Sequence, residues 1–285
     1  MGIGCHHCRG LADPDRRTFM GAAVAVAVVA SAALTGATRK ARAEPSAVAT
    51  DLKARLRGGC HLFNPEARMR LIDGLKAGHG EGLRQSGATY GGITETTGNA
   101  RLDQAMGIML ADLATRFGVR PGFGLYDDAE DANAVALQES LLPKSRGTVL
   151  FGRTLLMRGL QEDVDGDMFV MAICAHEFAH IAQSDTGYME RLVKGQATVR
   201  NLELHADFLS GYYIGGRGKT YTPQQLVALG RAWTHMGDTE FTNPDHHGTQ
   251  EERLAAIEAG YDLAHRQPGL TILDLCAAGV KYLGA

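Results

Sequence analysis

One long apolar segment, residues 167–184, constrains the fold of this chain more than any other feature of its sequence. The segment is expected to form a helix, and a helix that is apolar all round is expected to be buried. Three ionisable side chains, those of His176, Glu177 and His180, interrupt the apolar run. Burying them costs several kcal/mol unless another group compensates. The fold must therefore bring a compensating partner to this helix.

The spacing of these three residues indicates that the partner is a metal ion. His176 and His180 are four residues apart, so their rings lie on one face of a helix, about one turn apart. Two imidazoles in this arrangement can each reach one zinc ion at about 2.0–2.1 Å. Glu177 leans beside the ion, where a carboxylate can take a proton from water and return it to a leaving amine. The pattern H-E-x-x-H therefore predicts binding of one zinc ion, against the alternative of a chance match in a core helix.

A second apolar segment, residues 202–209, offers a third ligand for the ion. Within it, Glu203 and Asp207 are four residues apart and share a helix face. Glu203 can bind the ion, and Asp207 can accept the free ring N–H of a metal-bound histidine and fix its tautomer. His205 lies about 200° around the helix from Glu203 and is a poor partner on that face. The alternative for the two acids, a solvated helix edge, conflicts with the apolar residues around them.

The two segments together resemble the gluzincin zinc metallopeptidases, in which H-E-x-x-H is followed on a later helix by E-x-x-x-D. Residues 203–211, ELHADFLSG, are similar to the E-L-x-A-D-x-x-(A/S)-G segment of bacterial neutral zinc metallopeptidases and of the related CAAX-prenyl-protease-like family. Residues 133–136 and 147–152 are similar to two strands of these families, and residues 247–253 to their H-(G/P)-(T/S)-x-x-x-R segment. The resemblance covers about residues 130–260.

The resemblance implies a role for each matching residue. His176, His180 and Glu203 would bind zinc, and Glu177 would be the general base and acid. His247 would line the cleft and help to hold the oxyanion of the tetrahedral intermediate. In these families the two matching strands form the edge of the active-site sheet, to which a substrate strand can add by backbone hydrogen bonds.

Alternatives remain for the residues in and beside the segment 247–253. His247 could instead be a plain surface histidine, and His246 is its competing neighbour. Arg253 could pair with acids near the site, or it could lie exposed on its helix.

The function that the resemblance implies is that of a zinc-dependent endopeptidase, which acts on a peptide or protein substrate with one Zn²⁺ ion. The alternative is a catalytically silent zinc-binding module that serves as a chaperone, inhibitor or assembly factor in the cell envelope. Glu177 argues against this alternative, because a purely structural zinc site is closed by four protein ligands and needs no such acid. The integral-membrane relatives carry several spanning helices, whereas this sequence predicts no stable membrane span in its mature form.

The first 43 residues resemble a twin-arginine export signal. Arg16 and Arg17 precede an apolar stretch, residues 21–37, and an A-x-A-like cleavage site ends at Ala43. We therefore expect export to the periplasm or the outside of the cell, with an uncleaved membrane tether as the alternative. The segment is basic and the rest of the chain is mildly acidic, which gives no reason to expect a nucleic-acid partner.

The cysteines give weaker indications of metal binding, core packing and a disulfide. Cys5 and Cys8 form a small cluster that would be removed with the export signal. Cys174 lies in the apolar segment and is expected to be a small core residue. Cys60 and Cys276 could form one disulfide in an oxidising compartment, although the sequence alone does not bring them together.

Periodicity and cap residues predict a mostly helical α+β fold, with a zincin-like catalytic domain that has a small sheet beside the H-E-x-x-H helix. The expected domains are the signal at residues 1–43, a helical and loop region of unassigned role at 44–130, and a gluzincin-like metallopeptidase domain at 131–285. The expected strands are residues 119–126, 132–137 and 147–152. The expected helices are residues 99–118, 153–159, 167–184, 188–213 with a break near Gly195, 222–236, 249–265 and 271–282.

Overall fold

The computed structural model describes residues 65–77, 92–129, 132–161, 166–219, 221–222, 225, 229 and 242–285. The twin-arginine segment, Cys60 and most of the helix expected after Thr222 lie outside these residues. None of the described helices is both long enough and apolar enough to cross a membrane.

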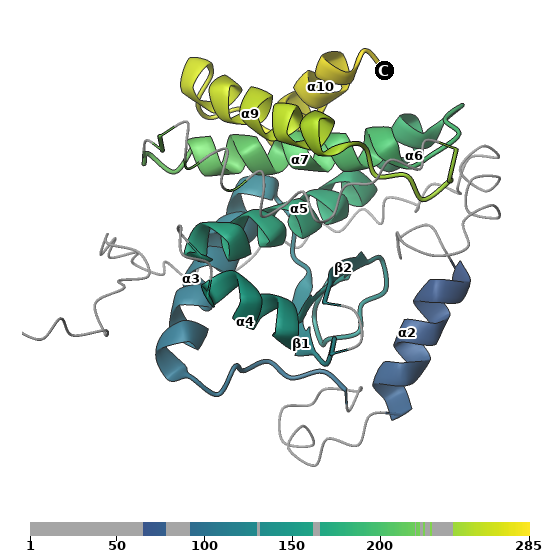
Figure 1. Cartoon of the computed structure of the whole chain (residues 1–285), viewed down its shortest axis with the longest axis vertical. Helices are drawn as coiled ribbons and strands as arrows, with labels where there is room; N and C mark the ends of the chain where they lie inside the picture. The colour runs from purple at the N-terminus through teal and green to yellow at the C-terminus, as the bar shows by residue number, and fades with distance from the viewer. Residues whose placement is uncertain are drawn as a thin grey trace, which may run out of the picture. The chain divides into compact units, whose positions relative to one another are not determined.

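The described residues form a mostly helical α+β fold with one small sheet, as the sequence predicts (Figure 1). In chain order the elements are α2 (Pro65–Ala77), α3 (Ala100–Phe117), β1 (Gly122–Tyr126), β2 (Ala134–Leu137), β3 (Thr148–Gly152), α4 (Arg153–Gln161), α5 (Gly166–Thr186), α6 (Tyr188–Val193), α7 (Arg200–Gly215), α9 (Gln250–Arg266) and α10 (Ile272–Leu283). Two predicted caps are confirmed. The Asn99 side chain accepts backbone hydrogen bonds at the start of α3, and Thr249 and Glu252 form a capping box at the start of α9.

The helix expected at residues 188–213 is two helices, α6 and α7, separated by residues 194–199. The break falls at the glycine that the sequence singled out. Gly195 has a φ of 74°, a left-handed conformation that glycine adopts without steric cost. The turn lets α7 pack against both α5 and α9.

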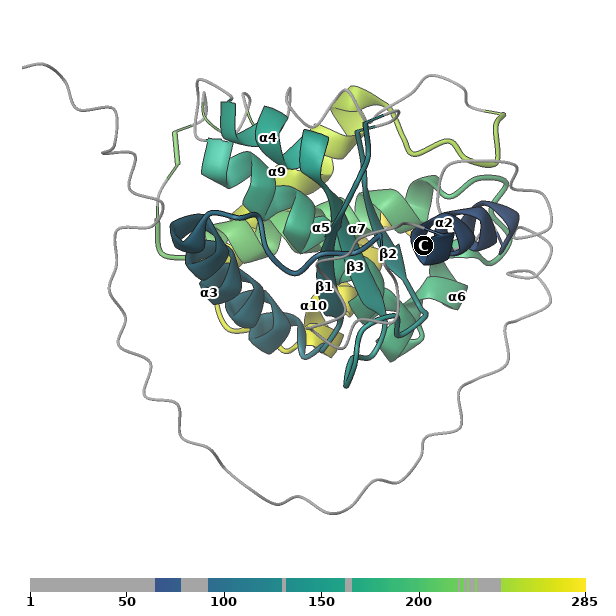
Figure 2. The same ribbon diagram turned by 90° about the horizontal axis from the view of Figure 1, so that it is seen from below.

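The sheet has the strand order β1-β3-β2, with β1 parallel and β2 antiparallel to the central strand β3. Successive residues of β2 face opposite sides of the sheet. Ala134 and Ala136 belong to the main core with α5, while Val135 and Leu137 pack in a second cluster that includes Ile72 of α2. Helices α5 and α2 therefore cover opposite faces of the strands, as Figure 2 shows.

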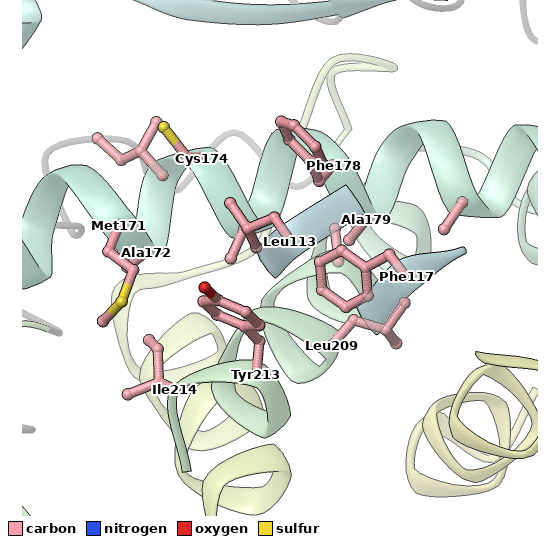
Figure 3. Close-up of a cluster of buried hydrophobic side chains, with 14 of the residues drawn as sticks. Leu113, Phe117, Met171, Ala172, Cys174, Phe178, Ala179, Leu209, Tyr213 and Ile214 are labelled. Atoms are coloured by element: carbon pink, nitrogen blue, oxygen red, sulfur yellow. The ribbon is translucent and has the colours of Figure 1, made fainter. Parts of the chain in front are cut away.

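Helix α5 lies between the sheet and α7 (Figure 1). Every residue from Met168 to Gln183 is buried, which explains why the segment has no polar face. Phe117 of α3 and Tyr213 of α7 pack beside α5 with their ring centroids 5.9 Å apart (Figure 3). Because α3 and β1 contribute to this core, the described part of residues 44–130 is packed together with the later part of the chain.

Helices α7 and α9 approach each other so closely that glycine is needed where they cross. A Cβ atom added to Gly211 would lie 2.0 Å from the carbonyl oxygen of Ile257. A Cβ atom added to Gly260 would lie 1.9 Å from the carbonyl oxygen of Phe208. Backbone atoms cannot rotate aside as the end of a side chain can, so the two helices would have to separate.

Gly260→Ala is therefore expected to destabilise the fold by about 1–3 kcal/mol, through the strain of the added methyl group. The measurement is the urea midpoint of the metal-free protein. Gly107→Ala in α3 is the matched control, because no neighbouring atom lies within 4 Å of its added Cβ. This exposed helical position should gain up to about 1 kcal/mol from the same substitution. Equal midpoints for the two variants would contradict the close crossing of α7 and α9.

Candidate metal centre

Three buried side chains from two helices converge on one point. His176 and His180 extend from α5 and Glu203 from α7, and one ligand atom of each lies within 4.8 Å of the others. The His176 Nε2 atom is 3.0 Å from His180 Nε2 and 3.3 Å from Glu203 Oε2, and His180 Nε2 is 3.5 Å from Glu203 Oε1. Two ligands of a tetrahedral ion at about 2.0–2.1 Å are about 3.3 Å apart, so these separations fit a single ion. The three residues could therefore hold a metal ion.

Asp207 holds the ring of His176 in place. The Asp207 Oδ1 atom lies 2.9 Å from His176 Nδ1. Because an ionised carboxylate only accepts hydrogen bonds, Nδ1 is the donor and Nε2 is left toward His180 and Glu203. The four-residue spacing of Glu203 and Asp207 thus brings one acid to each ring nitrogen of the same histidine.

Arg253 of α9 supports Asp207 from its other side. Its Nε donates to Asp207 Oδ2 at 2.7 Å, and a terminal nitrogen donates to Oδ1 at 2.9 Å. The guanidinium also lies 4.0 Å from Glu203 Oε2. The sequence left open whether Arg253 is exposed, and its side chain is in fact only 1% exposed. One buried cation therefore compensates two buried acids of the site.

His180 has a partner, Gln183, that was not among the residues predicted from the sequence. The Gln183 Oε1 atom lies 2.8 Å from His180 Nδ1, which again leaves Nε2 toward the centre. The two residues are three apart on α5 and are neighbours on its surface. The sequence feature that could have indicated this partner is the Gln183 amide, because a buried amide in an apolar helix needs hydrogen-bond partners. His205 lies away from the ligand face, as predicted, and is buried against α10.

The ionisable side chains of this site shift one another's pKa values. Burial favours neutral His176, but the hydrogen bonds and charges of Asp207 and Glu203 outweigh it and raise the pKa of His176 to about 9. Burial also favours neutral Glu203, yet the electrostatic effect of His180 and the hydrogen bond from His176 hold the pKa of Glu203 well below its usual range. In the metal-free protein a proton on His176 therefore balances the ionised Glu203.

If the group binds a divalent metal ion, binding is expected to release about one proton per ion from His176 at about pH 7.5, because the ion must displace the proton from Nε2. The release should diminish as the pH rises past about 9, where metal-free His176 loses that proton by itself. Calorimetric titration in buffers of different ionisation enthalpy measures the number of protons. A binding enthalpy that does not depend on the buffer would contradict the raised pKa.

Glu177 is buried beside the group without belonging to it. Burial raises the pKa of Glu177, against the opposing effect of the His176 and His180 charges. A carboxyl group with a raised pKa can hold a proton closer to neutral pH than an exposed one. The residue is therefore suited to accepting and returning a proton beside the atoms that could hold the ion.

The two histidines before α9 act on different acids. Besides burial and the ligand histidines, the charge of His247 influences Glu203 and lowers its pKa. His246 instead lowers the pKa of Glu252, in addition to the larger effect of the Arg200 hydrogen bond. His247 is half-buried and His246 is buried. Of the two, His247 is thus the one that acts on Glu203, a member of the converging group.

The two described cysteines lie in the core. Cys174 of α5 is a buried core residue, as the sequence predicts. Cys276 of α10 is buried with a free thiol. Its expected disulfide partner, Cys60, lies outside the described residues.

No family model matches this chain, and neither the curated proteins nor the solved structures give a significant match. The likeness to gluzincins is therefore carried by the short motifs alone. The function has to be inferred from the geometry of the residues that those motifs contain.

Proposed function

We propose that this chain is a zinc-dependent endopeptidase of the gluzincin type, exported by its twin-arginine segment. One observation carries the proposal. Three residues that suit a metal ion, His176, His180 and Glu203, converge beside a fourth ionisable residue, Glu177, that the ion does not need. A site that only binds metal has no use for this acid, whereas hydrolysis requires a proton acceptor there.

The donor set supports zinc as the ion. Two imidazole nitrogens and one carboxylate oxygen form a ligand set typical of catalytic zinc sites, which keep a fourth position for water or substrate. In such a site zinc activates water near neutral pH and polarises the carbonyl group of the substrate. Among the described residues the ion-binding group contains no fourth protein ligand, in line with an open position.

Each residue around the ion would have a separate role in the reaction. Glu177 would take a proton from water on its carboxylate and pass it to the leaving amine, which its raised pKa favours. Asp207 would keep the His176 ring turned so that Nε2 faces the ion. His247 would donate a hydrogen bond to the developing oxyanion.

The sheet supports a peptide as the substrate. Strand β2 is hydrogen-bonded to β3 and is an edge strand of the described sheet. It also packs against α5, the helix that carries Glu177 and the two histidines. An extended peptide could pair with this edge by backbone hydrogen bonds and lie along the site.

One observation favours a second candidate, a zinc-binding module without turnover. The residues His176, Glu177, His180 and Glu203 are each at most 4% exposed. A structural zinc ion needs no entrance, whereas hydrolysis requires a position that water and substrate can reach. The two candidates differ in whether a peptide is cleaved, so one experiment separates them.

The experiment measures the zinc content of the purified chain and its cleavage of a peptide library with and without a chelator. An endopeptidase should contain about one zinc ion per chain and lose cleavage when the ion is removed. Cleavage should return when zinc is added back. Bound zinc without cleavage of any peptide would support the second candidate and contradict the first. A chain that binds no zinc would contradict both.

Export has its own test, which is mass spectrometry of the N-terminus after secretion. A chain that begins at Glu44 has been released from its signal. An intact N-terminus in the membrane fraction would instead indicate a tethered enzyme.

A further inference from the structure

A series of buried hydrogen bonds leads from the metal ligand His180 to α10. The Gln183 side chain that meets His180 also places its Nε2 atom 2.9 Å from the Leu202 carbonyl oxygen and 3.0 Å from His205 Nδ1. His205 Nε2 in turn lies 3.0 Å from the carbonyl oxygen of Cys276. Gln183 and His205 are completely buried, so their polar atoms depend on these protein partners.

The direction of each hydrogen bond follows from the two carbonyl groups, which can only accept. Opposite the Cys276 carbonyl, His205 must carry its proton on Nε2, so neutral His205 has a bare Nδ1. Opposite the Leu202 carbonyl, Gln183 must present its NH₂ group, whose second N–H then donates to His205 Nδ1. Gln183 Oε1 is left to accept from His180 Nδ1.

The neutral form of His205 agrees with its surroundings. The ring is completely buried between two uncharged groups, the Gln183 amide and the Cys276 carbonyl, so a positive charge there would lack compensation. The Leu202 carbonyl at one end of the series and the Cys276 carbonyl at the other therefore require the same directions for all its hydrogen bonds. The proton of His180 is held on Nδ1, and Nε2 presents its lone pair to the point where His176 and Glu203 converge.

We propose that Gln183 and His205 are positioning residues that fix the tautomer and ring orientation of the metal ligand His180. The inference rests on the proposed zinc site and extends it. The two histidine ligands would be held by different means, because His176 is held by the ionised Asp207 and His180 by an uncharged amide and imidazole. An uncharged support orients the second histidine without adding another negative charge to the core.

Helix α10 completes this arrangement through its backbone. A Cβ atom added to Gly279 would lie 2.7 Å from Cδ2 and 2.8 Å from Nε2 of His205. The His205 ring is therefore packed directly against α10, one helical turn from the Cys276 carbonyl that it contacts. The position of α10 thus sets the position of His205 and, through Gln183, that of His180.

Gln183→Leu tests the proposal, because it keeps the approximate size of the side chain and removes its polar atoms. It is expected to weaken zinc binding about 10–100-fold, the usual effect of removing a partner of a ligand histidine. Competition with a chromophoric chelator measures the affinity in the full chain, without substrate or turnover. An affinity equal to that of the wild type would overturn the proposal.

Ser210→Ala is the matched control for a general loosening of the two helices. The Ser210 hydroxyl donates to the Ala172 carbonyl at 3.0 Å, a second buried hydrogen bond between α7 and α5 that lies outside the Gln183 series. Its loss should leave the zinc affinity unchanged. A decrease as large as that of Gln183→Leu would overturn the proposal in favour of a purely structural role.

A double variant tests whether the two residues act as one unit. His205→Phe should weaken zinc binding less than Gln183→Leu, because the Leu202 carbonyl still holds the amide. Adding His205→Phe to Gln183→Leu should then cause no further loss of affinity. Losses that multiply in the double variant would show that the residues act separately and would overturn the proposal.

Nitrogen NMR of the imidazole rings gives a direct readout in the unaltered chain. With zinc bound, His180 should be protonated on Nδ1 and His205 on Nε2, and protonation of His205 on Nδ1 would overturn the proposal. Zinc binding without peptide cleavage would contradict the endopeptidase alone, because the affinity and the tautomers do not depend on turnover. The two proposals can thus fail separately.

Discussion

Glu177→Gln is expected to keep its zinc ion and to lower kcat for peptide hydrolysis by about 10²–10⁴-fold, the usual contribution of a general base. Glutamine has nearly the same shape as glutamate but cannot accept the proton. The atoms that would bind the ion belong to His176, His180 and Glu203, so the substitution leaves them in place. Zinc content and the rate of cleavage of one library-derived peptide are the two measurements.

The stability of the same variant provides its control. Because burial raises the pKa of Glu177 in the metal-free fold, the wild type loses stability as the pH rises from the ordinary carboxyl pKa to the raised one. Metal-free Glu177→Gln should therefore be at least as stable as the wild type, with an advantage that grows across this pH range and is constant above it. Unchanged turnover, or loss of the zinc ion, would contradict the role given to Glu177.

Arg253→Met is expected to destabilise the metal-free fold by about 3–5 kcal/mol, because it leaves buried carboxylates without their cation. Asp207 would lose two hydrogen bonds, and Glu203 would lose the positive charge 4.0 Å away. The zinc affinity should fall as well, since Asp207 would no longer be held against His176. Urea unfolding and chelator competition measure the two effects.

Arg200→Met is the matched control for that variant. Arg200 of α7 pairs with Glu252 of α9 at 2.5 Å, so it joins the same two helices as Arg253 and Asp207 do. Both side chains of this pair are about one-third exposed, and a pair of this kind contributes at most about 1 kcal/mol. Equal losses of stability in the two arginine variants would show that the buried Arg253–Asp207 pair contributes no more than the exposed Arg200–Glu252 pair.

Features of the site that depend on local spacing could be predicted from the sequence. The four-residue intervals from His176 to His180 and from Glu203 to Asp207 place each pair on one helix face, and the structure brings the two faces together. The caps at Asn99 and Thr249 were equally local, because each cap is a contact between residues two or three positions apart.

Features that depend on the distance between helices could not be predicted. Arg253 and Asp207 are 46 residues apart, and only the close crossing of α7 and α9 turns a helix arginine into a buried partner. Gln183 meets His205 across α5 and α7, although the two are 22 residues apart. The spacing of residues along one helix does not contain this information, because it depends on how separate helices pack.

The order in which the elements are synthesised has a consequence for how the ion is acquired. A ribosome completes α5 and α7, and with them all three ion-binding side chains, before it makes α9 and α10. Arg253 and the Cys276 carbonyl, which orient two of those side chains indirectly, are therefore absent from the early nascent chain. If the site binds a divalent ion, we expect this intermediate to hold it more loosely than the complete chain does.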